Sequence, residues 1–350
     1  MRLCHRGEYK CQEYGTRYMA LLKACGNQKN VERASRIHDD ILRRGLLEKD
    51  IFLGNTLVSV YAKCGALAKA RQAFDQISVR DVVSWNALIS GYAQGGHSAE
   101  ALNCFDQMRG EGLYPSSVTY ICVLKACASI REIERGEIIH AEIVREGFLQ
   151  KHVSIGNALV DMYAKCGAIL KAQEVFNELE LRNIVSWNAL ITGYANHGYG
   201  EEACLLYGKM HKEGMKANIN TLLSLLETCS ATGNLVAGKL LHSCIVDDDN
   251  HDEDDCNNNA AVKNALISMY NRCGSLMDAH AVFKNTSNIY DTVSWNAMIS
   301  ANSQHGNSSK ALDLFLQMQM KGIKTTENTF ISVLSACSHT GLLTEGLLYF

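Results

Sequence analysis

Apolar residues recur along this chain at the spacing of amphipathic helices. In residues 82–116 two stripes repeat every three or four positions, as they do on one face of a helix. The first contains Trp85, Leu88, Ile89, Tyr92 and Ala93, and the second contains Ala101, Phe105 and Met108. A polar, glycine-containing stretch at 94–98 separates them. The pattern predicts a pair of helices joined by a short turn.

Composition supports an all-α chain. Apolar residues make up 47% of the 350 residues and charged residues 20%, which is enough to fill a core. The chain has one proline, Pro115, so helices are ended mainly by glycine and polar clusters. A single helix pair cannot bury both apolar faces, so neighbouring pairs are expected to stack on one another.

Three phrases recur at a long, nearly fixed interval. VVSWNAL starts at Val82, IVSWNAL at Ile184 and TVSWNAM at Thr292. The three tryptophans are therefore 187 − 85 = 102 and 295 − 187 = 108 residues apart. YAKCGA at Tyr61 and Tyr163 and the LLKAC-type phrases repeat at the same interval. Such periodicity indicates a tandem array, with Trp85, Trp187 and Trp295 as core anchors of equivalent helices.

Each interval divides into repeats of about 36, 31 and 35 residues. After a short leader at 1–14, the expected repeats are 15–50, 51–81, 82–116, 117–152, 153–183, 184–218, 219–259, 260–291, 292–326 and a partial repeat at 327–350. The seventh contains an acidic insertion at 247–259.

The segment 82–116 resembles a pentatricopeptide repeat, and the 35/36/31 alternation resembles the P, L and S repeats of the plant PLS class. The uniform 34-residue period and the WxxLGxxY phrase of tetratricopeptide repeats are absent. The resemblance covers residues 15–350. It implies a right-handed α-solenoid that binds single-stranded RNA, one nucleotide per repeat, through the fifth and the last side chain of each repeat.

Asparagine occupies the fifth position in six repeats. Paired with the last residue of the same repeat, the implied base-reading set is Asn55 with Asp81, Asn86 with Ser116, Asn157 with Asn183, Asn188 with Asn218, Asn264 with Asp291, and Asn296 with Thr326. An amide can donate and accept hydrogen bonds to a base. The alternative is that each Asn caps its helix or bonds a neighbouring backbone group.

The resemblance also implies a target. Asn in the fifth position implies a pyrimidine, with Asp last favouring U, Ser favouring C and Asn accepting either. The 36-residue repeats carry Met19, Ile121, Leu223 and Ile331 there and are expected to be spacers. The implied target resembles 5′-NUCNYYNUYN-3′. Val83, Val185 and Val293 match the position that packs between bases, although ordinary helix packing explains valine equally well.

Charge modifies this picture. The formal net charge is −3, whereas phosphate binding normally uses Lys and Arg. Residues 247–259 contain seven acidic side chains, so the rest of the chain carries −3 + 7 = +4. The run is expected to be a solvated insertion that weakens RNA binding locally. A metal site there is a lesser alternative, because the central glycine of an EF-hand loop is missing.

No active site is found in the sequence. Fourteen cysteines include no CxxC pair, and seven lie at repeat-locked positions, where we expect small buried residues in a reducing compartment: Cys25, Cys64, Cys127, Cys166, Cys229, Cys273 and Cys337. The fragment HxE, found in zinc deaminases, occurs at His140, His211 and His251 without a following CxxC. We therefore expect no enzyme activity, cofactor or metal.

The ends of the chain suggest a fragment. The sequence stops within a repeat at Phe350, and residues 1–14 show no clear signal or transit peptide, nor is there an 18-residue apolar run for a membrane. The family resemblance implies a mitochondrion or chloroplast, and a role in RNA processing, most simply C-to-U editing with a deaminase or accessory factor in trans. The alternative function is a helical-repeat scaffold for a peptide or protein.

Overall fold

The computed structural model describes residues 2–48, 50–249, 260–285 and 292–340. These residues form helices and turns, and no β-strand occurs in them. They divide into two compact parts, an N-terminal part at 1–182 and a C-terminal part at 183–350. The predicted all-α solenoid class is confirmed.

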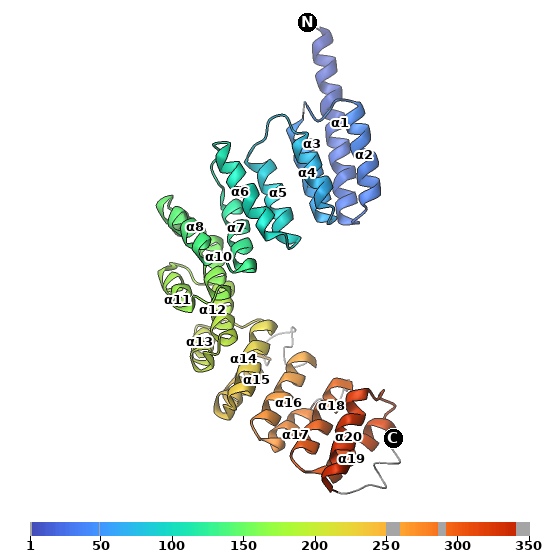
Figure 1. The fold of residues 1–350 in the computed structure, drawn as a ribbon, viewed down its shortest axis with the longest axis vertical. Coiled ribbons are helices and arrows are strands. Elements are labelled where there is room, and N and C mark those ends of the chain that lie inside the picture. The colour runs from blue at the N-terminus through green and yellow to red at the C-terminus, as the bar shows by residue number, and fades with distance from the viewer. Residues whose placement is uncertain (1, 49, 250–259, 286–291, 341–350) are drawn as a thin grey trace. The chain divides into compact units, whose positions relative to one another are not determined.

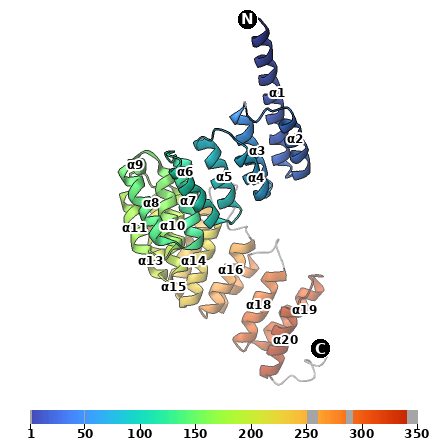
Figure 2. The same ribbon diagram turned by 45° about the horizontal axis from the view of Figure 1, so that its top comes forward.

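The N-terminal part consists of helix pairs stacked side by side (Figures 1 and 2). The first helices of the pairs are α1 (Arg2–Asn27), α3 (Ile51–Lys63), α5 (Val82–Gln94), α7 (Ser117–Ile130) and α10 (Val153–Lys165). The second helices are α2 (Val31–Arg43), α4 (Leu67–Asp75), α6 (Ser98–Gly110), α8 (Ile133–Arg145) and α11 (Ile169–Glu178), with the short α9 (Phe148–Lys151) before α10. Each first helix contacts the first helix of the next pair, so these helices form a continuous row.

The C-terminal part follows the same plan. Its first helices are α12 (Ile184–Asn196), α14 (Ile219–Thr232), α16 (Ala260–Arg272), α18 (Thr292–Gln304) and α20 (Glu327–Thr340). Its second helices are α13 (Gly200–Lys212), α15 (Leu235–Asp249), α17 (Leu276–Lys284) and α19 (Ser308–Met320). Here too the first helices contact one another in sequence.

The tryptophans lie in the core, as the periodicity predicted. Trp85, Trp187 and Trp295 are 1%, 3% and 1% exposed. The Trp85 ring meets the Phe74 ring edge-on, with centroids 4.6 Å apart, so it joins α5 to the second helix of the preceding pair. Its Nε1 donates a hydrogen bond to Glu111 Oε2 at 3.0 Å. One aromatic side chain thus couples two successive helix pairs.

The start of the first helix differs from the sequence expectation. Helix α1 begins at Arg2 and runs through Gly15, so residues 2–14, which we set apart as a leader, continue the first helix. Good helix formers such as Arg, Leu, Lys and Glu and the absence of proline favour this continuation. Residues 250–259, which hold most of the acidic insertion, and residues 341–350 of the partial repeat lie outside the described residues.

The prediction that the repeat-locked cysteines are buried holds for four of the seven. Cys25, Cys127, Cys229 and Cys337 are buried, whereas Cys64, Cys166 and Cys273 of the KCG-type phrases are half-buried. The phrase ends a helix: Gly65, which follows Cys64, has a φ of +74°, which glycine adopts without a steric penalty. The Cys64 thiol donates to the Cys25 carbonyl oxygen at 3.9 Å. These cysteines therefore serve at helix ends, where part of the side chain reaches solvent.

Candidate nucleic-acid interface

The last residue of a repeat lies at the N-cap of the next first helix. Asp81 accepts a hydrogen bond from the Ser84 backbone N–H at 2.8 Å, and Ser116 accepts one from the Thr119 backbone N–H at 3.3 Å. Asn218 caps α14 in the same way. Asp, Ser and Asn are favoured at this position because their oxygens satisfy free N–H groups of the first turn. Sequence reasoning assigned these residues to reading and did not foresee the capping role.

In the N-terminal part, the fifth and last residues of two repeats are brought into direct contact. Asn55 Nδ2 donates to Asp81 Oδ1 at 3.3 Å, and Asn86 Nδ2 donates to Ser116 Oγ at 2.9 Å. Each bond joins one first helix to the N-cap of the next. The asparagines therefore do not cap their own helices.

The C-terminal part repeats this arrangement with variations. Asn296 Nδ2 donates to Thr326 Oγ1 at 2.9 Å. In the Asn188 repeat the contact is different, because the Asn218 backbone N–H donates to Asn188 Oδ1 at 3.4 Å. This contact fits the alternative interpretation, in which the asparagine bonds a neighbouring backbone group.

For the two remaining predicted pairs, the members are described one by one. Asn157 lies in the N-terminal part and Asn183 in the C-terminal part. Asn157 is buried, whereas Asn183 is exposed and caps α12. Asn264 Oδ1 accepts a hydrogen bond from Ser294 Oγ at 2.6 Å, but its predicted partner Asp291 lies outside the described residues.

Asp81 is held as a carboxylate. Burial would raise the pKa of Asp81, but hydrogen bonds from the Ser84 backbone and hydroxyl and from the Asn55 amide outweigh it and lower the pKa. At neutral pH the Asp81 side chain is therefore a hydrogen-bond acceptor only. Ser116, in contrast, has a hydroxyl that can donate or accept.

Two of the three predicted reading asparagines of the N-terminal part, Asn55 and Asn86, line a groove along α1, α3 and α5. The groove has a volume of about 770 Å³. Val83 and Phe52, each at the second position of a repeat, also line it. Val83 is 58% exposed and Phe52 is 70% exposed. An exposed Phe ring can stack on a base, and an exposed valine can pack against one.

All three predicted packing valines are exposed. Val185 and Val293 in the C-terminal part are 59% and 57% exposed. Sequence reasoning missed Phe52 and Val118, which occupy the same position and are 70% and 52% exposed. They lie in repeats of 31 and 36 residues, outside the SWNA phrase that marks the valines, but at the same second position of the repeat.

Basic side chains accompany the groove. Lys23 of α1 and Lys63 of α3 are exposed and line it, and Lys125 of α7 is exposed at the position equivalent to Lys23. Lys165 is exposed but lies 2.8 Å from Asp161. The groove therefore combines amides, apolar side chains and ammonium groups, which suit base edges, base faces and phosphates respectively.

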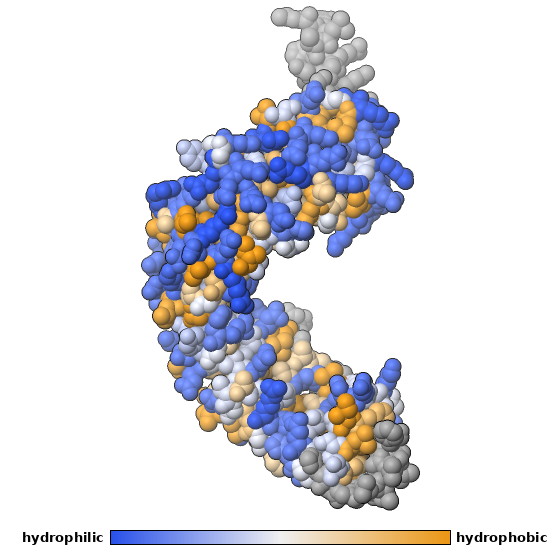
Figure 3. Space-filling model, viewed as in Figure 1, coloured by the Kyte–Doolittle hydropathy of each residue, from blue (hydrophilic) through white to orange (hydrophobic). Residues whose placement is uncertain are grey.

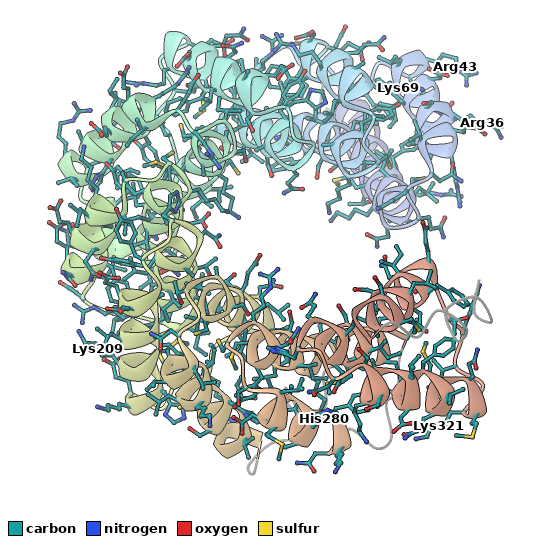
Figure 4. The ribbon with its side chains drawn as sticks, turned by 60° about the horizontal axis from the view of Figure 1, so that its bottom comes forward. Arg36, Arg43, Lys69, Lys209, His280 and Lys321 are labelled. Carbon is teal, nitrogen blue, oxygen red and sulfur yellow. The ribbon has the colours of Figure 1, made fainter. Side chains whose placement is uncertain are left out.

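The opposite side of the N-terminal part is formed by the second helices. Arg36 and Arg43 on α2 and Lys69 on α4 lie there, away from the row of first helices (Figure 4). The face of this part seen in Figure 3 mixes hydrophilic and hydrophobic residues without a continuous apolar band.

No cluster of three or more His, Cys, Asp or Glu side chains suited to a metal occurs in the part of the chain that the structure describes. Within those same residues, no helix is both long and apolar enough to span a membrane. His140 and His211, two of the HxE histidines, lie in α8 and α13, and His251 lies outside the described residues.

Comparisons with known proteins match these features. A model described as the PPR repeat family matches residues 80–129, 182–231 and 290–339, and a PPR repeat model matches 18–46, 55–82 and 157–184. The chain belongs to the pentatricopeptide repeat family. The resemblance noted in the sequence is thus confirmed.

Similar proteins come from Arabidopsis thaliana. The pentatricopeptide repeat-containing protein At2g33680 is 37% identical over 95% of this chain and 45% of its own length. The protein CRR2, named as chloroplastic, is 36% identical over 94% of this chain and 50% of its own length. The chain therefore spans half or less of the length of these relatives.

Solved structures share the fold. The maize pentatricopeptide repeat protein PPR10 aligns with a TM-score of 0.74 at 18% identity, over 91% of this chain and 46% of that protein. PPR10 has also been solved in complex with an 18-nucleotide psaJ RNA element, and that structure aligns with a TM-score of 0.65.

Proposed function

We propose that this chain binds single-stranded RNA through its row of first helices, one nucleotide per repeat, at a target resembling 5′-NUCNYYNUYN-3′. The observation that carries the proposal is the contact between the fifth and last side chains of a repeat beside the groove along α1, α3 and α5. Two side chains held together there can read one base edge.

The register of the proposal rests on the repeat boundaries 15–50, 51–81, 82–116, 117–152, 153–183, 184–218, 219–259, 260–291, 292–326 and 327–350. It is supported by the starts of the first helices, since α3, α5, α7, α10, α12, α14, α16, α18 and α20 begin at residues 51, 82, 117, 153, 184, 219, 260, 292 and 327. In this register Asn55 and Asp81 read the second nucleotide, and Asn86 and Ser116 read the third.

The chemistry of these two pairs differs in a way that favours different pyrimidines. The Asp81 carboxylate accepts the N3–H of uracil and cannot donate to the N3 of cytosine. The Ser116 hydroxyl can donate to cytosine N3. In both repeats the asparagine amide has a second N–H, beyond the one bound to the last residue, that can donate to a pyrimidine carbonyl oxygen.

We also propose a wider role for this RNA binding. We place RNA binding in a mitochondrion or chloroplast, where the target marks a site for RNA processing, most simply C-to-U editing by a deaminase or accessory factor in trans. This rests on the family and on the chloroplastic name of relatives such as CRR2. The chain itself is proposed to be a non-catalytic RNA-binding array.

The test is equilibrium binding of the full chain to the ten-nucleotide RNA and to a control with purines at the six pyrimidine positions, at one fixed salt concentration. We expect tighter binding to the pyrimidine RNA. Asn86→Ala should weaken this binding by about fivefold to tenfold, the value of one or two hydrogen bonds. Equal binding of both RNAs, or none, would refute base reading and favour a scaffold for a peptide or protein.

A further inference from the structure

In four of the six repeats with a predicted reading asparagine, a buried hydroxyl from the third residue of the following repeat bonds that asparagine. Ser84 and Thr119 in the N-terminal part and Ser294 and Thr329 in the C-terminal part are at most 1% exposed. Each donates to the oxygen of the reading asparagine at 2.5–2.6 Å: Ser84 to Asn55, Thr119 to Asn86, Ser294 to Asn264 and Thr329 to Asn296. This hydroxyl cannot touch RNA, yet it is bonded to a side chain that is proposed to do so.

At the Asn86 repeat the bonds form a closed circuit. Asn86 Nδ2 donates to Ser116 Oγ at 2.9 Å, Ser116 Oγ lies 3.0 Å from Thr119 Oγ1, and Thr119 Oγ1 donates to Asn86 Oδ1 at 2.5 Å. Thr119 Oγ1 also accepts the Ser116 backbone N–H at 2.9 Å.

The circuit limits what Ser116 can offer to a base. A hydroxyl oxygen has two lone pairs and one proton. The lone pairs of Ser116 Oγ are used by Asn86 Nδ2 and by the Thr119 backbone N–H. Its proton points to Thr119 Oγ1, and giving it to a base exchanges that hydrogen bond for one to the base. Ser116 is therefore available as a donor, which suits the N3 of cytosine.

Uracil would disturb the circuit. Its N3–H needs a lone pair of Ser116 Oγ, and one becomes free only if Asn86 Nδ2 turns away. The flipped amide then presents Oδ1 to Ser116, whose hydroxyl donates a hydrogen bond to it, and the Thr119 hydroxyl, now facing Nδ2, loses its acceptor. A buried hydroxyl without an acceptor is costly, so uracil is disfavoured.

We propose that Thr119 is a specificity-determining residue that acts through Asn86 and Ser116 to make the third nucleotide cytosine rather than uracil. The inference rests on the proposed RNA-binding function and adds a position that contacts no base. Thr119 is a positioning residue, because its only route to the RNA is through the two side chains it bonds.

The neighbouring repeat provides a matched contrast. Asn55, Asp81 and Ser84 have the same arrangement, but the last residue is a carboxylate that only accepts. The preference for uracil over cytosine at the second nucleotide therefore does not depend on the Ser84 hydroxyl.

The test uses Thr119→Val, which keeps the shape of the side chain and removes the hydroxyl, and Thr119→Ser, which keeps the hydroxyl. Affinity is measured for ten-nucleotide RNAs that differ only in C or U at the third nucleotide. Thr119→Val should lower the C-over-U affinity ratio by about fivefold to a hundredfold, the range for one unsatisfied buried group, and Thr119→Ser should retain the ratio. Ser84→Ala is measured with U or C at the second nucleotide, and its ratio should persist whatever its effect on affinity.

The outcomes separate the two proposals. If the wild-type chain prefers cytosine and Thr119→Val keeps the full preference, the role of Thr119 is refuted and RNA reading stands. If the wild-type chain binds pyrimidine RNA over purine RNA but shows no C-over-U preference, the role of Thr119 is also refuted. If it binds neither RNA, both proposals fail. A thermal melt of each variant checks that a lost preference is not lost folding, and equal losses in Thr119→Val and Thr119→Ser would refute the hydroxyl mechanism.

Discussion

Three lysines on the first helices of the N-terminal part should account for a measurable share of the salt dependence of RNA binding. Lys23, Lys63 and Lys125 are exposed, and the first two line the groove that contains Asn55 and Asn86. Each lysine that contacts a phosphate releases condensed counterions from single-stranded RNA and contributes about 0.7 to the slope of log K against log salt.

The magnitude follows from this count. Replacing all three with glutamine should reduce the slope by about 3 × 0.7, or about 2. Between 50 and 200 mM salt, a fourfold change, a slope of about 2 corresponds to about a twentyfold change in affinity. The wild-type chain should therefore lose about twenty times more affinity than the triple variant over this range. Because the lysines bind phosphates, the preference for particular bases should not change.

The chain offers a control of equal charge. Arg36, Arg43 and Lys69 are exposed on the second helices of the same part, away from the row of first helices (Figure 4). Replacing these three with glutamine changes the net charge by the same amount. The assay is fluorescence anisotropy of a labelled ten-nucleotide RNA at several salt concentrations. If the two triple variants show the same slope, phosphate contact by the groove lysines is refuted, and only the overall charge matters.

Three further perturbations test the packing of the array. Trp85→Ala should destabilise the N-terminal part by about 3–5 kcal/mol in urea denaturation, whereas Trp85→Phe, which keeps a ring, should cost less; equal costs would contradict a packing role. Burial lowers the pKa of His140, and its Nε2 is buried without a partner, so stability should hold above about pH 6.5 and fall as the pH drops below it, which thermal melts from pH 8 to 5 would reveal. His140→Gln should weaken that dependence without abolishing it, because burial also lowers the pKa of His38, His242 and His280. Gly91→Ala places a Cβ 2.6 Å from Ala62 Cβ and should destabilise by about 1–3 kcal/mol, whereas Gly110→Ala meets no atom within 4 Å and should be neutral or stabilising.

The sequence alone determined the class of the fold and the position of its core. Helical periodicity and the repeat interval identify Trp85 and Trp295 as equivalent core residues, because the same position of stacked repeats packs against equivalent neighbours. The same periodicity placed an asparagine at the fifth position of six repeats, which marked a polar exception in an apolar motif. Residue type and spacing are properties of the sequence itself, so the buried tryptophans and the fifth-position asparagines could be predicted from it.

Tertiary structure decided how these residues act together. Ser116 and Thr119 lie 30 and 33 residues after Asn86 in the chain. Only the stacking of α5 on α7 brings them within hydrogen-bond distance of Asn86. A serine in the first turn of a helix reads as a capping residue whether or not an asparagine of the preceding repeat lies beside it. Hydrogen-bond partners depend on distances across helices, which periodicity does not specify. The structure therefore decides which hydroxyl orients which amide, and the sequence decides that both are present.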